Sequence, residues 1–129
     1  MSGCYQDLEV WQKPLELTWE VYRGTQHFPN QEIYGLTNQM RRAAVSIASN
    51  IAEGKGKSSD REFALFLCHA RGSLHELETH AIIAKQLGYL PEDAARRLEA
   101  MTIETGKILN GLISSMRPKV EDRRSKLVA

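Results

Sequence analysis

The stretch Phe63–Ala84, FALFLCHARGSLHELETHAIIA, carries the most regular apolar pattern in the chain. Its apolar residues recur at alternating steps of four and three, as in a heptad repeat, and they are Phe63, Leu67, Ala70, Leu74, Leu77, Ala81 and Ala84. Ser59 followed by Glu62 forms a capping box before this stretch, and Gly88 supplies a left-handed stop after it. The pattern therefore predicts a helix over 59–87.

An earlier apolar series also recurs at steps of three and four, and its members are Leu8, Trp11, Leu15, Trp19 and Tyr22. It predicts a helix over 8–28 with Asp7 as the N-cap. Pro14 lies inside that range and lacks a backbone N–H, so the helix either kinks there or begins near the proline. We favour a kink.

Pro29 and Asn30 end that helix, and the next apolar series comprises Leu36, Met40, Ala43, Ile47 and Ile51. This series predicts a helix over 32–54, in which Gly35 separates a short leading turn from the main body. The last series follows Pro91 and comprises Ala94, Leu98, Met101, Thr105, Ile108 and Leu112. It predicts a helix over 91–116 that ends before Pro118, followed by a basic, mobile tail over 118–129.

Four predicted helices with short connections, and no segment with the alternation of a strand, indicate an all-α protein. The simplest arrangement is an antiparallel up-down-up-down four-helix bundle over 1–117. The last two predicted helices also carry apolar residues outside their main series, namely Phe66, Ile82, Ile83, Ile103, Leu109 and Ile113. Such a wide apolar arc exceeds the needs of one bundle core, so we expect contacts between identical subunits.

The composition is that of one ordinary globular domain, with 129 residues, 42% hydrophobic and 26% charged. Lys and Arg number 17 and Asp and Glu 16, so any affinity for nucleic acid must come from a local patch. The first residues lack the features of a secretory signal, and no run of eighteen apolar residues occurs. We expect a cytoplasmic protein without membrane contacts. The two cysteines, Cys4 and Cys68, predict neither a disulfide framework nor a zinc site.

The loop around Gly56, Lys57 and Ser58 resembles the end of a Walker phosphate-binding loop. The first glycine of that motif falls on Ile51, however, and a helix rather than a strand precedes the loop. We interpret the loop as a turn between helices, with weak anion affinity left open at the start of the helix over 59–87.

Metal and catalytic chemistry find little support in the residue spacings. His75 and His80 are five residues apart and do not share a helix face, and no histidine follows a glutamate by three positions. We therefore expect no catalytic residue, no cofactor and no metal.

Four polar residues follow one side of the helix predicted over 32–54, and they are Ser46, Ser49, Asn50 and Glu53. Their spacing of i, i+3, i+4 and i+7 places them beside several alanines. The stripe either faces solvent or forms a buried hydrogen-bonded strip where small residues let another helix approach closely. A further hypothesis makes Asn50 and Glu53 part of a small anion-binding protein or enzyme, which would require a concave pocket.

Five basic residues gather around the turn between the helices predicted over 32–54 and 59–87, and they are Arg41, Arg42, Lys55, Lys57 and Arg61. Repeated in a ring of identical subunits, such a patch could make several salt-sensitive phosphate contacts with RNA or DNA. Aromatic residues do not alternate with these basic residues in the sequence, so base stacking is not predicted.

Three blocks together resemble a known family: DLEVWQKPLEL at 7–17, GLTNQMRRAAVSIASNIAEGKGK at 35–57 and GSLHELETHAIIAKQLGYL at 72–90. The chain is similar over almost all of its length except the tail to the bacterial four-helix-bundle proteins first known from intervening sequences in 23S rRNA genes. It departs from the family pattern at Ala48, where many relatives carry proline, and at Pro14, where alanine is usual.

The resemblance implies an antiparallel four-helix subunit that assembles into a homopentameric ring, in a family without established enzymatic activity. Relatives include the accessory variability protein of diversity-generating retroelements, which works with a reverse transcriptase and binds nucleic acid through basic surface. We therefore expect a non-enzymatic, ring-forming interaction protein that binds RNA or DNA weakly. The alternative is a structural scaffold or accessory subunit for a protein partner such as a reverse transcriptase.

Overall fold

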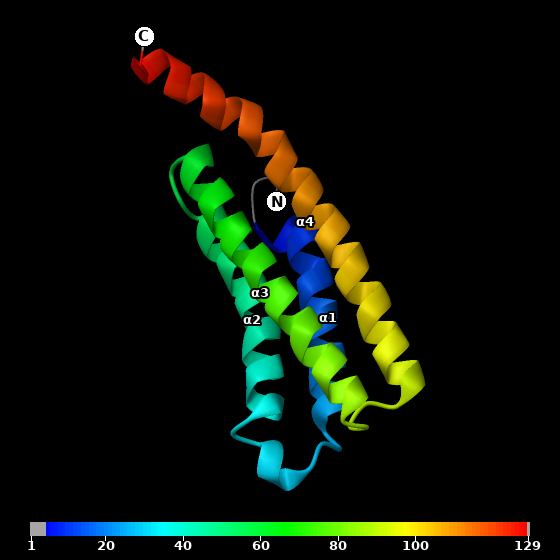
Figure 1. The fold of residues 1–129 in the computed structure, drawn as a ribbon. Helices are drawn as coiled ribbons and strands as arrows, with labels where there is room; N and C mark the ends of the chain where they lie inside the picture. Colours follow the sequence, from blue (N-terminus) through cyan, green and yellow to red (C-terminus); the bar gives the residue numbers. More distant parts are fainter. Residues whose placement is uncertain (1–4, 129) are drawn as a thin grey trace.

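The computed structural model describes the backbone of residues 5–128 and the side chains of residues 5, 6 and 8–116. It contains four long helices, α1 (Glu9–Thr25), α2 (Leu36–Lys55), α3 (Asp60–Gln86) and α4 (Glu92–Val128), and two short 3-10 turns, η1 (Tyr5–Asp7) and η2 (Asn30–Glu32). The helices run alternately up and down (Figure 1), and contacts join α1 to α2, α2 to α3, α3 to α4 and α4 to α1. Residues 5–128 form no strand, so the predicted antiparallel four-helix bundle is confirmed.

Helix α3 forms where the heptad pattern predicts it. Ser59 is the N-cap, and its hydroxyl accepts a hydrogen bond from the backbone N–H of Glu62 at 3.2 Å. At the other end Gly88 has a φ of 78° and its N–H donates to Lys85, while the N–H of Tyr89 donates to the carbonyl of Ala84. Six of the seven predicted core residues are buried, and Ala81 is half-buried.

Helix α1 begins one residue later than predicted and ends three residues earlier. The N–H of Leu8 donates to the carbonyl of Tyr5 at 3.1 Å, which closes the turn η1 and places Asp7 inside it. Leu8 is therefore the N-cap, with no side-chain capping bond, and the prediction of Asp7 was wrong. The helix runs from Glu9 through the buried Pro14 to Thr25, so it does not begin at the proline.

The apolar series predicted for α1 lies on one helix face, but only its first members, Leu8 and Trp11, pack against the core. The buried apolar residues are Val10, Pro14, Leu17 and Val21, whereas Trp19 and Tyr22 are exposed. Leu17 and Val21 follow Leu15 and Trp19 by two positions, which corresponds to a rotation of about 200° around the helix. The later members of the series, Trp19 and Tyr22, therefore point outward, and Tyr22 lies beside Arg41 of α2.

Helix α2 starts at Leu36 rather than at 32, because the 3-10 turn η2 and Gly35 precede it. Glu32, from η2, accepts a hydrogen bond from the N–H of Leu36 through its carboxylate at 3.3 Å. Gly35 is the N-cap residue, so the predicted separation of a leading turn from the main helix is confirmed. Near the other end, α2 lies very close to α3, since a Cβ on Gly54 would be 2.6 Å from the Cβ of Phe66.

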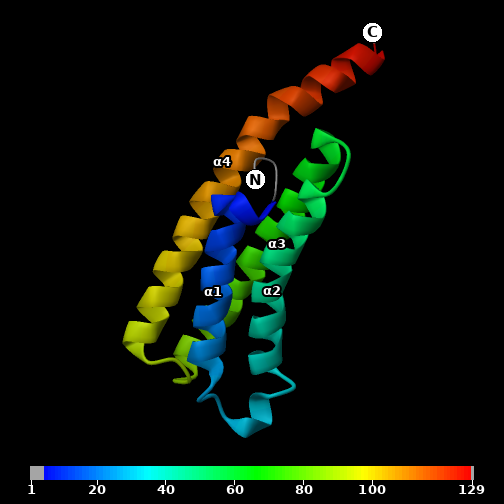
Figure 2. The same ribbon diagram turned by 180° about the vertical axis from the view of Figure 1, so that it is seen from behind.

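Helix α4 differs from the prediction in its core face and in its length. Beyond Leu98 the buried positions are Thr102, Thr105, Leu109 and Ile113, so Leu109 and Ile113 belong to the core instead of an outer surface. The helix also continues past Pro118 to Val128, where the sequence predicted a mobile tail. Proline lacks the backbone N–H that donates a helical hydrogen bond, but a helix can continue through it with a kink. The last turns extend beyond the ends of α2 and α3 (Figures 1 and 2).

Candidate interaction surfaces

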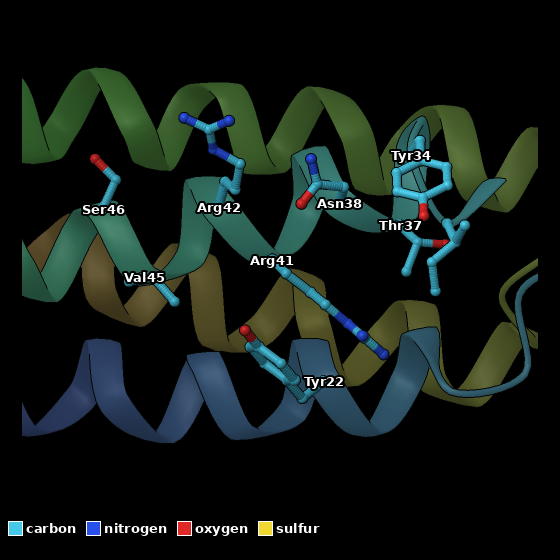
Figure 3. A pocket seen from close by; sticks show the side chains of 9 residues that line it. Tyr22, Tyr34, Thr37, Asn38, Arg41, Arg42, Val45 and Ser46 are labelled. Atoms are coloured by element: carbon cyan, nitrogen blue, oxygen red, sulfur yellow. The ribbon is translucent and has the colours of Figure 1, made fainter.

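The first candidate surface is a basic and aromatic hollow on the outer side of α2, which we call the Tyr34 face. It encloses about 740 Å³ and is lined by Tyr22, Ile33, Tyr34, Thr37, Asn38, Arg41, Arg42, Val45 and Ser46. Figure 3 shows these side chains reaching from α1, from α2 and from the residues just before α2. Tyr34 is 91% exposed, which is unusual for a large aromatic side chain and leaves its ring free to contact a partner.

The two adjacent arginines of the Tyr34 face have different surroundings. Arg41 points toward α1, where its Nε donates to the hydroxyl of Thr25 at 2.9 Å and its guanidinium lies 4.7 Å from the ring centre of Tyr22. Arg42 points toward α3 and is exposed, and it forms no hydrogen bond or ion pair with any described side chain. Arg41 is therefore held in place by the bundle, whereas Arg42 remains available.

The second candidate surface is a groove between α3 and α4, which we call the Ile82 groove. It encloses about 500 Å³ and is lined by Glu78, Ala81, Ile82, Lys85, Gln86, Ala95, Leu98, Glu99, Thr102 and Ile103. Ile82 and Ile103 are 58% and 50% exposed. The sequence predicted that these two isoleucines would exceed the needs of the core, and their exposure confirms that prediction.

The predicted polar stripe divides into a structural half and a solvent-facing half. The hydroxyl of Ser46 shares a hydrogen bond with that of Ser73 on α3 at 2.8 Å, and the amide of Asn50 donates to the carbonyl and hydroxyl oxygens of Ser46. Ser49 and Glu53 are exposed. Asn50 and Glu53 line neither the Tyr34 face nor the Ile82 groove, so the geometry offers no support for an anion or catalytic site built on them.

The five basic residues do not form one cluster. Arg41 and Arg42 belong to the Tyr34 face, whereas Lys55, Lys57 and Arg61 surround the turn between α2 and α3. Positions 41 and 55 are fourteen residues apart, which corresponds to about 21 Å along the helix. Arg41 and Arg42 lie inside α2 and Lys55 lies at its end, so the helix predicted over 32–54 already implied this separation.

Aromatic rings lie beside three of the predicted basic residues, contrary to what their sequence neighbours suggested. Besides the Arg41–Tyr22 contact, the Nζ of Lys55 lies 5.7 Å from the ring centre of Phe63 and that of Lys57 lies 5.3 Å from the ring centre of Phe66. The aromatic partners come from other helices, so no local sequence pattern could reveal them. Contacts at such distances allow attraction between each cation and the face of its ring.

A buried carboxylate on α1 joins this helix to α4 through an ion pair, which is structural. The buried carboxylate of Glu20 accepts from Arg97 at 3.0 Å and from Arg23 at 2.7 Å. The hydrogen bond to Glu20 raises the pKa of Arg97, and a similar bond to Glu104 raises the pKa of Lys13.

A second contact joins the connection between α3 and α4 to the turn η2. The hydroxyl of Tyr89 donates to the carboxylate of Glu32 at 3.1 Å, and this hydrogen bond raises the pKa of Tyr89.

The described residues contain no group of three histidine, cysteine, aspartate or glutamate side chains placed to hold a metal ion. His75 is exposed, but His80 is buried, and its Nδ1 has no hydrogen-bond partner in the described part of the chain. The hydroxyl of Thr37 is also buried and unpaired there. None of the helices over residues 5–128 offers a stretch long and apolar enough to span a bilayer.

Comparison with known proteins identifies the family. The family model for the 23S rRNA-intervening sequence protein matches residues 6–111, which include most of the bundle and both candidate surfaces. The chain belongs to this family. The resemblance of the three sequence blocks is thereby confirmed.

A solved structure of similar fold is the 1.70 Å crystal structure of a protein of unknown function from the S23 ribosomal protein family of Bacteroides thetaiotaomicron. It is 22% identical to this chain, with a TM-score of 0.72, and the alignment covers 81% of this chain and 97% of that protein. At this identity the likeness supports the fold alone. The comparison with curated proteins found no match.

Proposed function

We propose that this member of the 23S rRNA-intervening sequence protein family is a non-enzymatic interaction protein that assembles with copies of itself into a ring. The observation that carries the proposal is the exposure of large apolar side chains on different sides of the bundle, with Tyr34 on one and Ile82 and Ile103 on another. Exposed apolar patches of this kind are typical of protein contacts. A ring of five subunits is the arrangement that the family resemblance implies.

The proposed ring presents the turn between α2 and α3 once per subunit, and we propose that this turn binds the phosphates of RNA or DNA weakly. Lys55, Lys57 and Arg61 contribute three positive charges there. Glu53, Asp60 and Glu62 contribute three negative charges, so segment 53–62 has a net charge of 3 − 3 = 0. The affinity of one turn should therefore be low, and repetition around a ring would increase it.

Fluorescence anisotropy with labelled single-stranded RNA and DNA, measured over a series of salt concentrations, tests the phosphate contacts. Replacing Lys55, Lys57 and Arg61 with glutamine should weaken binding and reduce the slope of log affinity against log salt by about 2, at about 0.7 per lost contact with a single strand. Lys107→Gln is the control, because Lys107 is an exposed lysine of α4 whose neighbour Gly106 lies against Leu74, in the middle of α3 and away from this turn.

The control variant should bind like the unaltered protein. Absence of binding even at low salt, binding that does not respond to salt, or an unchanged slope in the triple variant would contradict phosphate contacts at this turn. None of these outcomes would contradict self-assembly, which is measured separately by molecular mass.

A further inference from the structure

We infer that the Tyr34 face of one copy docks against the Ile82 groove of the next copy. This assignment rests on the proposed self-association and specifies the two surfaces that meet. It also separates the two groups of basic residues by role, because Arg41 and Arg42 then lie in the subunit contact while the α2–α3 turn stays open to solvent.

The two surfaces carry opposite charges. Arg41 and Arg42 are the charged residues that line the Tyr34 face, and Glu76 lines an adjoining hollow that shares Tyr34 and Arg42, so the charge is +2 for the face and 2 − 1 = +1 with this hollow included. Glu78, Glu99 and Lys85 are the charged residues that line the Ile82 groove, so its lining carries a charge of 1 − 2 = −1. Complementary charges of this kind orient partners and disfavour contacts between like surfaces. A face that met another Tyr34 face would bring four arginines together.

The apolar parts of the two surfaces are also complementary in shape, because one has a projecting side chain and the other is a groove. Tyr34 projects almost fully into solvent, at 91% exposure. The groove has the small residues Ala81 and Ala95 in its lining and exposed isoleucines, Ile82 and Ile103, beside them. Tyrosine and arginine are enriched in the cores of protein interfaces, where they fill such hollows.

The positions of the two surfaces determine the kind of assembly. The Tyr34 face lies over α2 and its border with α1, whereas the groove lies between α3 and α4, on another side of the four-helix square. Figure 2 shows α1 and α2 from behind the view of Figure 1. A contact between different surfaces of identical subunits leaves one free face and one free groove at the ends of any open chain, so subunits add until a ring closes, or form an open filament where the rotation between them does not close.

A mixing experiment tests this asymmetry. The face variant carries Tyr34→Ala and Arg42→Glu, and the groove variant carries Ile82→Ser and Ile103→Ser, so the two altered surfaces gain no complementary charges. Every contact needs one intact face and one intact groove, and each variant has only one of the two. Each variant alone should therefore have the mass of one chain, 14.6 kDa, in light scattering. An equimolar mixture should form pairs of 2 × 14.6 = 29.2 kDa and nothing larger, because the intact groove of one variant meets the intact face of the other.

Leu65→Ser is the control, since Leu65 is a comparably exposed apolar residue of α3 that lines neither surface. It should leave the mass of the assembly unchanged, and circular dichroism should show that all variants stay helical. The assignment of surfaces would be overturned if either variant kept the mass of the unaltered assembly, if the mixture stayed at the mass of one chain, or if Leu65→Ser dissociated the assembly.

The mixing experiment also separates this inference from the proposed function. An unaltered protein that is itself a single chain would contradict self-association. An unaltered assembly with a mixture that fails to pair would contradict only the choice of surfaces. Loss of nucleic-acid binding in the face variant, without a change of mass, would show that the Tyr34 face binds nucleic acid instead of a second copy.

Discussion

Replacing Gly54 with alanine tests the close approach of α2 to α3. Gly54 is buried in the last turn of α2, and an added Cβ would lie 2.6 Å from the Cβ of Phe66 and 3.1 Å from the Cδ1 of Phe63. Carbon atoms pack favourably at about 3.5–4.0 Å, so the closer contact is short by about 1 Å. The Cβ of Phe66 cannot move away by side-chain rotation. The two helices must therefore separate locally.

The magnitude follows from two opposing terms. Alanine is about 1 kcal/mol better than glycine inside a helix. Forcing an extra methyl group into a well-packed interior costs about 1–3 kcal/mol. We therefore expect Gly54→Ala to lower the free energy of unfolding by about 0–2 kcal/mol, which is the difference between those two terms.

Gly72→Ala is the matched comparison, because Gly72 lies inside α3 and an added Cβ would meet nothing within 4 Å. It should raise the free energy of unfolding by about 1 kcal/mol through the same helix preference. The two variants should then differ by the packing cost alone, about 1–3 kcal/mol, or about 0.5–1.5 M in the urea midpoint at an m-value of about 2 kcal/mol per M.

Urea denaturation followed by circular dichroism measures both variants at one protein concentration, because assembly would make the midpoint depend on concentration. Equal midpoints for Gly54→Ala and Gly72→Ala, or a more stable Gly54→Ala, would refute the tight contact between α2 and α3.

Two further predictions concern hydrogen bonds between elements. Ser46→Ala removes a 2.8 Å bond to Ser73, and the free energy of unfolding in urea should fall by about 1 kcal/mol, with less than additive loss in the double alanine variant. Because the bond to Glu32 raises the pKa of Tyr89, the folded state favours the neutral phenol, and this contribution to stability should be present below pH 10 and lost as the pH rises through the raised pKa. Thermal melts at increasing alkaline pH should show this loss in the unaltered protein and less of it in Tyr89→Phe.

The sequence predicted the parts of the fold that depend on local patterns. The heptad series of α3, the cap at Ser59 and the stop at Gly88 all depend on residues within one or two turns of each other, and they are confirmed. The core face of α1 could not be predicted in this way. The predicted series from Leu8 to Tyr22 has a helical spacing as regular as that of the buried residues Val10, Leu17 and Val21. Only packing against the neighbouring helices decides which of the two series is buried.

The candidate surfaces were predicted less completely than the fold. Exposed Ile82 and Ile103 could be inferred, because they lie outside the seams of their helices. Tyr34 was missed, although it stands between the η2 turn and Gly35, outside any helical series, and this position was a usable signal. The pairing of Arg41 with Tyr22 could not be found, since the two residues are on different helices.

The molecular mass of the unaltered protein at micromolar concentration tests the central claim most directly. Light scattering should give a single discrete assembly that does not grow with concentration, and five subunits would have a mass of 5 × 14.6 = 73 kDa. A mass of 14.6 kDa at every concentration measured would contradict self-association through the exposed apolar surfaces.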